Sequence, residues 1–335
     1  MLKQRYQYKT YSLSLIAIRT FLFLRELYRK TLSKYFSVPT LLRSAGYNFE
    51  IVKDLIEFNM ANGQELLKNI HYVRYVEYAL CVQKLEICRG MLLLDVGSGG
   101  SILPSYLIYK GATVYSTDID NYVLCQMDMC RNNKLIADSD LSRLKIDIQD
   151  IKKTNYPDNY FDRIVLLSTI EHITADGDKV AMKEVARILK KAGRAFITFD
   201  AARDAHELIY QAPRYLGFRI EGIKRIIEDI EKDETRRVQI DFKVLKNGFS
   251  PGYTRFYNEA TMMERLVKPS GLKLVEHGFY GDHMFVLRAF FDRKRFVEYL
   301  YWLQPILALL LYRKYNSGLA LNKKPGAIGY CVLEK

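Results

Sequence analysis

The sequence has few features that would fix a chain through covalent bridges, metals or a membrane anchor. Its five cysteines form no C-x-x-C pair and no recognisable zinc spacing, which excludes the common zinc and dithiol motifs. No signal peptide is evident, and no run of about 20 nearly uncharged residues would cross a membrane. We find no internal repeat and no low-complexity tract. These absences favour a cytoplasmic protein whose thiols are free and mostly buried.

The composition is that of a folded protein, but its charge is unevenly distributed. The hydrophobic fraction of 49% and the charged fraction of 27% are close to globular averages, so the 335-residue chain can bury a core. The net charge of +13 lies entirely in two segments, because residues 1–35 carry +7 and residues 285–335 carry +6. Both segments are rich in apolar and aromatic residues. This pattern suits contact with an anionic membrane surface, but helices packed on the core would show it too.

The middle of the chain has the pattern of a parallel sheet with crossover helices. Helical spacing over residues 49–88, broken at Asn62-Gly63, gives way after Met91 to short β-rich runs that alternate with helical stretches. We expect strands at 91–96, 113–117, 143–147, 162–167, 194–199, 272–280 and 327–333. We expect helices at 101–110, 121–133, 178–191 and Asn258–Val267.

A glycine-rich turn follows the first expected strand. Residues 92–101 read LLLDVGSGGS, with Asp95 at the end of the strand and Gly97 and Gly99 in the turn. Such a turn needs glycine where φ is positive or where a ligand approaches the backbone. Taken alone, it would equally serve NAD or a nucleotide phosphate. Asp118 ends the second strand about twenty residues later, where a carboxylate can hold a ribose diol, as in NAD enzymes too.

Three later sequence elements narrow the choice of cofactor for this glycine turn. Asp150-Ile151 follows the third strand, a P-D-x-x-F-D run spans 157–162, and Glu171-His172 follows the fourth strand. With these elements in this order, the region from about Arg74 to Asp200 resembles the class I S-adenosylmethionine-dependent methyltransferases. The resemblance is to the small-molecule branch of that family, which includes quinone-biosynthesis enzymes.

The resemblance implies an α/β fold with a Rossmann-like, seven-stranded, mostly parallel sheet and flanking helices. Residues 327–333 would form the antiparallel strand between the fifth and the sixth. Residues 1–70 would be an N-terminal helical extension, and residues 71–335 the methyltransferase domain with helical insertions at about 203–255 and 285–322. Ser101 stands where a third glycine is usual, and because serine tolerates a helix start and can cap it, we expect the cofactor to fit.

The resemblance also implies roles for residues at the strand ends. Asp118 would bind the ribose diol of S-adenosylmethionine, Ile119 would pack on adenine, and Asp150 would accept the adenine amino hydrogen. The set expected around the cofactor is Asp95, Gly97, Ser98, Gly99, Asp118, Ile119, Asp150, Ile151 and Ser168, with Arg74 and Glu77 on a helix that covers it.

His172 has two interpretations. It would be the general base that takes a proton from the acceptor, or a residue at a helix start that only shapes the pocket. Some relatives bind Mg²⁺ through E-x-x-E-H at this place. Ser168 occupies the first acidic position here and removes a hard oxygen ligand, so we expect no metal.

The expected activity is S-adenosylmethionine-dependent methylation of a small-molecule or lipid-linked acceptor, on oxygen ahead of carbon or nitrogen. Residues 11–30 and 291–314 would provide peripheral contact with an anionic membrane. The alternatives are an RNA methyltransferase and a catalytically silent scaffold of the same fold. The fourth strand ends in S-T-I-E-H rather than in N-P-P-Y, and no RNA-binding module is visible, so the sequence argues against nucleic acid.

Overall fold

The computed structural model describes residues 16, 19–20, 46–62, 70–213, 249–282, 312–315, 317 and 327–335. This part of the chain holds an eight-stranded sheet in the order β3-β2-β1-β4-β5-β10-β8-β9 and a two-stranded sheet, β6-β7. The strands are β1 (Leu92–Val96), β2 (Thr113–Asp118), β3 (Leu144–Ile148), β4 (Phe161–Leu167), β5 (Leu189–Ala201), β6 (His206–Pro213), β7 (Phe249–Phe256), β8 (Lys273–Asp282), β9 (Tyr312–Tyr315) and β10 (Ala327–Glu334).

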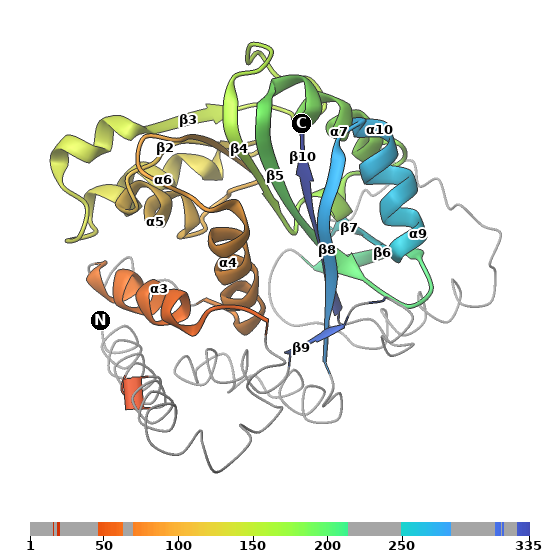
Figure 1. Ribbon diagram of the computed structural model, residues 1–335, viewed down its shortest axis with the longest axis horizontal. Helices are drawn as coiled ribbons and strands as arrows, with labels where there is room; N and C mark the ends of the chain where they lie inside the picture. The colour runs from red at the N-terminus through yellow and green to blue at the C-terminus, as the bar shows by residue number, and fades with distance from the viewer. Residues whose placement is uncertain are drawn as a thin grey trace.

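Helices cover both faces of the large sheet (Figure 1). One face carries α3 (Phe49–Ala61), α4 (Tyr72–Leu85), α5 (Leu103–Tyr109) and α6 (Cys125–Arg131), and the other carries α7 (Gly177–Ile188), α9 (Glu259–Met262) and α10 (Lys268–Ser270). Short turns of other helix types are η1 (Asn121–Leu124), η2 (Asp138–Arg143), η3 (Ile170–His172) and the π-helix η5 (Met263–Val267). Each layer of helices packs its own apolar cluster against the sheet, so the sheet is buried on both sides.

The centre of the parallel half is β1. It pairs in parallel with β2 on one side and with β4 on the other, and Leu93 and Leu94 are fully buried on opposite faces. A continuous apolar run suits such a strand because both of its faces lie against helices. The carboxyl ends of β1, β2 and β4 therefore meet at one edge of the sheet, where ligands bind in folds of this kind.

The expected seven strands are all present, and the strand at the end of the chain lies where we predicted it. β10 runs antiparallel between β5 and β8. The helix expected at 178–191 ends earlier, at Ile188, because Leu189 already pairs with Phe161 of β4. An eighth strand, β9, pairs antiparallel with β8 at the sheet edge and was not predicted.

The two insertions were predicted to be helical, and their described residues are not. In the first, β6 and β7 form an antiparallel hairpin that runs from His206 opposite Phe256 to Pro213 opposite Phe249. In the second, β9 forms a strand. Pairing between segments far apart in the chain leaves no local periodicity, which is why the helical prediction was wrong here. The rest of both insertions, residues 214–248 and most of 285–322, lies outside the described residues.

Residues 46–62, the described end of the predicted N-terminal extension, pack against the helices beside the large sheet. Asn48 caps α3 by accepting a hydrogen bond from the Glu50 amide at 3.0 Å, and Val52, Leu55 and Ile56 are buried in the cluster that also contains α4 and α5. Most of residues 11–30 and 291–314, the predicted membrane contacts, lies outside the described part. Among the described residues, no helix is both long enough and apolar enough to cross a membrane. The domain boundary at residue 70 stays a prediction.

Replacing Gly329 with alanine is expected to destabilise the fold. Gly329 lies opposite Phe199 in the β10–β5 pair, and a Cβ there would overlap the edge of the fully buried Phe199 ring. We expect a loss of about 1–3 kcal/mol in the free energy of unfolding, as for other overpacked cores. Urea denaturation measures this loss. The control is Val275→Thr at a half-exposed position of β8, and equal midpoints for Gly329→Ala and this control would contradict the prediction.

Candidate active site

The glycine turn after β1 is held in shape by the neighbouring strand. Gly97 and Gly99 have positive φ angles of 68° and 46°, which glycine adopts without strain. The amides of Gly97 and Ser98 donate to the Thr117 carbonyl at 2.8 and 3.2 Å. A Cβ on Gly97 would overlap the side chain of Thr169, whereas on Gly99 it would meet only the Asp118 carboxylate, at 3.8 Å. Gly97 is therefore required by packing, and the backbone at Gly99 is open to a ligand.

A buried glutamine on α6, Gln126, holds the glycine turn through hydrogen bonds. The Gln126 side-chain amide on α6 donates to the carbonyls of Gly99 and Ser101 at 2.9 and 2.8 Å. The Ser101 hydroxyl accepts from the Leu103 amide at 3.3 Å, so it serves the start of α5, as we predicted for a serine at this position. Sequence reasoning missed Gln126, because nothing in the local pattern around a polar residue on a helix indicates a contact about twenty-five residues away.

Asp118 lies beside the turn, as predicted. Its Oδ2 accepts from the Gly99 amide at 3.0 Å, and its Oδ1 accepts from the Asp120 amide at 3.1 Å. The carboxylate is half-buried at the carboxyl end of β2. Fixed by two amides in this way, it can still accept hydrogen bonds from hydroxyl groups of a ligand.

Next to the turn is a cavity of about 210 Å³. It is lined by Arg74, Tyr78, Asp95, Gly97, Ser98, Gly100, Ser101, Leu103 and Leu167. Four of these nine belong to the set predicted around the cofactor, so the structure brings the helix before β1 and the turn after β1 to one space.

Asp95 is the unusual residue of this cavity. Its side chain is 3% exposed, and its Oδ2 has no hydrogen-bond partner within the described ranges. Burial, and then the nearby Asp118 carboxylate, raises the pKa of Asp95 to about 8, although Arg74 opposes the shift. An isolated buried carboxylate with an unused oxygen is costly unless a ligand with a donor or a positive charge occupies the space beside it.

Arg74 reaches the cavity from α4 and is held by Glu77. The Arg74 guanidinium donates to Glu77 Oε2 at 2.7 Å, and the Glu77 carboxylate raises the pKa of Arg74. The other oxygen of Glu77 accepts from the Ser168 and Thr198 hydroxyls, both at 2.6 Å. Glu77 and Ser168 are therefore hydrogen-bonded to each other. Neither side chain lines the cavity. Ser168 has a positive φ of 47°, which this bond helps to hold.

The remaining residues of the predicted set lie farther out. The Ile119 side chain is 73% exposed directly after Asp118. Asp150 is exposed, where its carboxylate accepts from the Lys152 amide at 2.9 Å, and Ile151 is buried. None of the three lines the cavity, and their roles toward an adenine ring stay predictions.

Glu171 and His172 form the η3 turn after β4. His172 Nδ1 lies 2.8 Å from the Tyr253 carbonyl oxygen and 3.1 Å from the Thr254 hydroxyl, both on β7. The Glu171 side chain is buried, and its Oε2 has no partner among the residues with described positions. Burial, and then the Asp200 carboxylate, holds the pKa of Glu171 well above its usual range.

This arrangement provides two kinds of chemistry at one edge of the sheet. Arg74 offers a cation, and Asp95 offers an acidic group that can become a carboxylate when a positively charged part of a ligand lies beside it. His172 offers an imidazole, and Glu171 offers a buried carboxyl group whose pKa is raised by burial. The described residues contain no cluster of three or more His, Cys, Asp or Glu side chains that could hold a metal ion.

Comparison with known sequences finds a family that matches the part of the chain containing the glycine turn. Residues 94–197 match the family described as "Methyltransferase domain". Over these residues, the match supports a class I S-adenosylmethionine-dependent methyltransferase domain, with S-adenosylmethionine as its cofactor.

Two relatives show how far the likeness extends. The methyltransferase GfsG of Streptomyces halstedii is 31% identical over 116 residues, which are 34% of this chain and 40% of the relative. The ubiquinone biosynthesis O-methyltransferase of Coxiella burnetii (strain Dugway 5J108-111) is 26% identical over 132 residues, which are 39% of this chain and 53% of the relative. The chain thus matches about half, or less, of the length of these relatives.

Solved structures are similar only at a distance. The MccD protein is 14% identical with a TM-score of 0.46, and the match covers 80% of this chain and all of that one. Phosphoethanolamine N-methyltransferase 2 of Haemonchus contortus, in complex with S-adenosylmethionine, is also 14% identical, with a TM-score of 0.42 and coverage of 77% and 52%. The family assignment rests on the domain match and not on these structures.

Replacing Asp95 with asparagine is expected to flatten the dependence of stability on pH. The folded pKa of about 8 lies above the ordinary value of 3.8, so the native state holds an extra proton between these two values. The free energy of unfolding of the cofactor-free protein therefore falls as pH rises through this range, and Asp95→Asn removes that fall. At about 1.4 kcal/mol for each unit of pKa, the difference amounts to a few kcal/mol.

Thermal unfolding of both proteins from about pH 5 to about pH 9 measures the effect. Other groups titrate in both proteins, so only the difference between their slopes reports on Asp95. Asp150→Asn, at an exposed carboxylate, is the control and should keep the wild-type slope. Parallel curves for the wild type and Asp95→Asn would show that this carboxyl titrates normally.

Proposed function

We propose that this protein transfers a methyl group from S-adenosylmethionine to a hydroxyl of a small-molecule or lipid-linked acceptor. The observation that carries the proposal is the cavity that Arg74 and Asp95 line together beside the glycine turn. The methionine part of the cofactor has a carboxylate, an ammonium and, at its reactive end, a sulfonium. A guanidinium and a buried carboxylate with an unused oxygen match that combination of charges.

The residues present fit this cofactor. Arg74 would hold its carboxylate and Asp95 would accept from its ammonium group, while the open backbone at Gly99 leaves room for close approach. Asp118, already fixed by two amides, would hold the ribose diol. The other residues that we propose to contact the cofactor are Gly97, Ser98, Ile119, Asp150 and Ile151, with Glu77 and Ser168 supporting Arg74 from behind.

The acceptor chemistry requires little of the protein beyond placement and removal of a proton. The cofactor supplies a methyl group on a sulfonium leaving group, so the chain must hold the acceptor oxygen in line and take its proton. We propose that His172 takes the proton of the acceptor hydroxyl. The contact of its Nδ1 with the Tyr253 carbonyl leaves a lone pair on Nε2 in the neutral ring, where a proton can bind. The similarity to the Coxiella burnetii O-methyltransferase supports a hydroxyl acceptor.

Cofactor binding and methyl transfer are expected to separate by variant. Calorimetry should detect S-adenosylmethionine binding to the wild type and its loss in Asp118→Ala and Gly97→Arg, while His172→Gln keeps the binding and loses about 10²-fold or more in methyl transfer. Labelled methyl from the cofactor is followed into extract separated into lipid, small-molecule, glycan and RNA pools.

Asp138→Ala, at an exposed acid away from the turn, is the control and should behave as the wild type. Label in RNA alone would overturn the acceptor class in favour of an RNA methyltransferase. Absence of cofactor binding would overturn the proposal as a whole and favour a silent scaffold.

We further propose that the basic apolar segments, residues 11–30 and 291–314, contact an anionic membrane surface. The proposal rests on their composition and charge. The protein should sediment with vesicles that contain phosphatidylserine at low salt and be released at high salt, because exposed charges are screened. Arg293→Glu combined with Lys294→Glu should weaken this binding, whereas Lys183→Glu with Lys191→Glu should not. Equal binding to neutral and anionic vesicles would contradict an electrostatic contact.

A further inference from the structure

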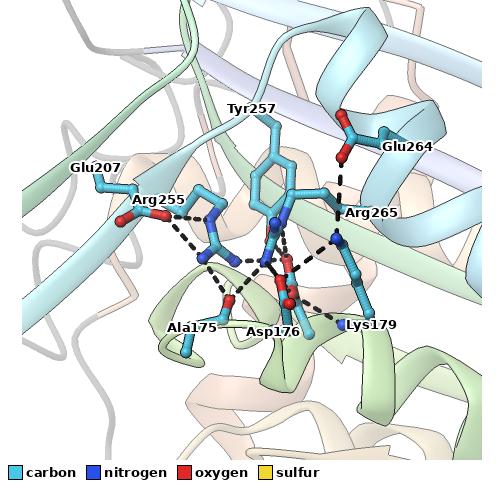
Figure 2. A network of polar contacts seen from close by, with 9 residues as sticks. Ala175, Asp176, Lys179, Glu207, Arg255, Tyr257, Glu264 and Arg265 are labelled. Atoms are coloured by element: carbon cyan, nitrogen blue, oxygen red, sulfur yellow. Dashed lines mark hydrogen bonds and ion pairs between the residues drawn. The ribbon is translucent and has the colours of Figure 1, made fainter. Parts of the chain in front are cut away.

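A buried charge network fastens the β6–β7 hairpin to the start of α7 (Figure 2). At its centre is Asp178 in the first turn of α7, whose side chain is fully buried. Its Oδ2 accepts from Arg255 Nη1 at 2.5 Å, from Arg265 Nε at 2.8 Å and from the Tyr257 hydroxyl at 2.8 Å. Its Oδ1 accepts from Arg265 Nη2 at 2.7 Å. One carboxylate thus joins β7, the residue after it and the π-helix η5.

Both arginines also bind the turn between η3 and α7. Arg255 Nη2 and Arg265 Nη2 donate to the Ala175 carbonyl at 2.7 and 2.5 Å, and Figure 2 shows the two guanidinium groups converging on this region. Ala175 has a positive φ of 53°, which a residue with a Cβ rarely adopts, so the turn is held in an unfavourable conformation by these bonds. On its other side, Arg255 donates to Glu207 of β6 at 2.8 and 3.0 Å. The network therefore fixes the hairpin and the turn to each other.

The part of β7 that this network fixes is also the part that meets His172. Tyr253 and Thr254 come directly before Arg255, and both are buried. The Tyr253 carbonyl oxygen and the Thr254 hydroxyl are the two groups next to His172 Nδ1. A second attachment stabilises the same stretch, because the Tyr257 amide donates to the Asp200 carbonyl at 2.9 Å at the end of β5.

A carbonyl oxygen can only accept a hydrogen bond, and this decides the state of the imidazole ring. With the Tyr253 carbonyl at 2.8 Å, Nδ1 must carry the hydrogen, and the neutral ring then has its lone pair on Nε2. We propose that the β6–β7 hairpin, anchored by Asp178 and Arg255, is a positioning element that holds His172 in the tautomer able to accept a proton at Nε2. The proposal rests on the proposed function, in which His172 takes the proton of the acceptor hydroxyl, and adds the residues that keep it ready to do so.

The first measurement observes the tautomer directly and does not need the acceptor. The protein is labelled with ¹⁵N-histidine, and spectra that correlate ring nitrogens with carbon-bound hydrogens distinguish a nitrogen that carries hydrogen from one with a lone pair. The chain has five histidines, so the His172 signals are assigned by comparison with His172→Gln. We expect hydrogen on Nδ1 and a lone pair on Nε2 in the neutral ring of the wild type.

Arg255→Lys keeps one positive charge near Asp178 but loses the fork that reaches Ala175 and Glu207. We expect His172 in this variant to populate both tautomers, and the rate of methyl transfer to fall roughly tenfold or more while S-adenosylmethionine affinity stays within about twofold. Arg194→Lys is the matched control, because this arginine of β5 pairs with Glu334 of β10 away from the carboxyl ends of the parallel strands, and it should change neither measurement.

Tyr257→Phe removes one hydrogen bond to Asp178 and leaves both arginines, so it repeats the test if Arg255→Lys does not fold. A wild-type ring with hydrogen on Nε2, or a folded Arg255→Lys or Tyr257→Phe protein with an unchanged tautomer and rate, would overturn the positioning role. If calorimetry finds no cofactor binding while the spectra show the expected tautomer, the proposed function fails and the positioning of His172 stands.

Discussion

The site depends on one buried carboxylate, that of Glu77. It joins α4 to the turn after β4 through Ser168 and to β5 through Thr198, and it holds the Arg74 guanidinium at the cavity. Removing a carboxylate from water is costly, and the cost is offset only where every lone pair is well used. Two hydroxyls and one guanidinium provide that here. Because the same group orients a cation for the ligand and keeps the Ser168 backbone in a rare conformation, the helix before β1 and the turn after β4 cannot be placed independently.

The two buried charge networks described above are built on the same principle but support different parts of the proposed site. Glu77 supports Arg74 at the cavity, and Asp178 supports the hairpin that contacts His172. Both carboxylates are fully buried, and both bind arginine from another part of the chain or from the next turn of a helix. Asp95 and Glu171 are buried as well, but each has one oxygen with no hydrogen-bond partner among the described residues, and both have raised pKa values. The structure thus separates acids that hold the fold from acids left to a ligand.

Much of this could be predicted from the sequence, because it depends on residues close together in the chain. The apolar run of β1, the glycines after it, the acid that ends β2 and the acid that follows β3 form local patterns, and they gave the strands of the parallel half and the place of Asp118. The contacts that we did not predict all join residues far apart in the chain. Gln126 reaches the glycine turn from α6, Ser168 turns to Glu77 rather than to the cavity, and β7 supplies the groups beside His172. β9 and the β6–β7 hairpin were missed for the same reason, since strand pairing between distant segments leaves no periodic signal.

The position of β10 has a consequence for how the chain reaches this fold. β10 fills the place between β5 and β8, yet it follows β5 by more than a hundred residues. During synthesis, the apolar strand β5 is therefore complete long before β10, its neighbour on that side, has been made. β8 is also made before β10 and lacks the same partner. Unpaired strand edges bind other chains readily. The nascent protein therefore exposes unpaired edges of β5 and β8 until residues 327–334 have left the ribosome. The large sheet can therefore become continuous only when β10 is available to pair with β5 and β8 together.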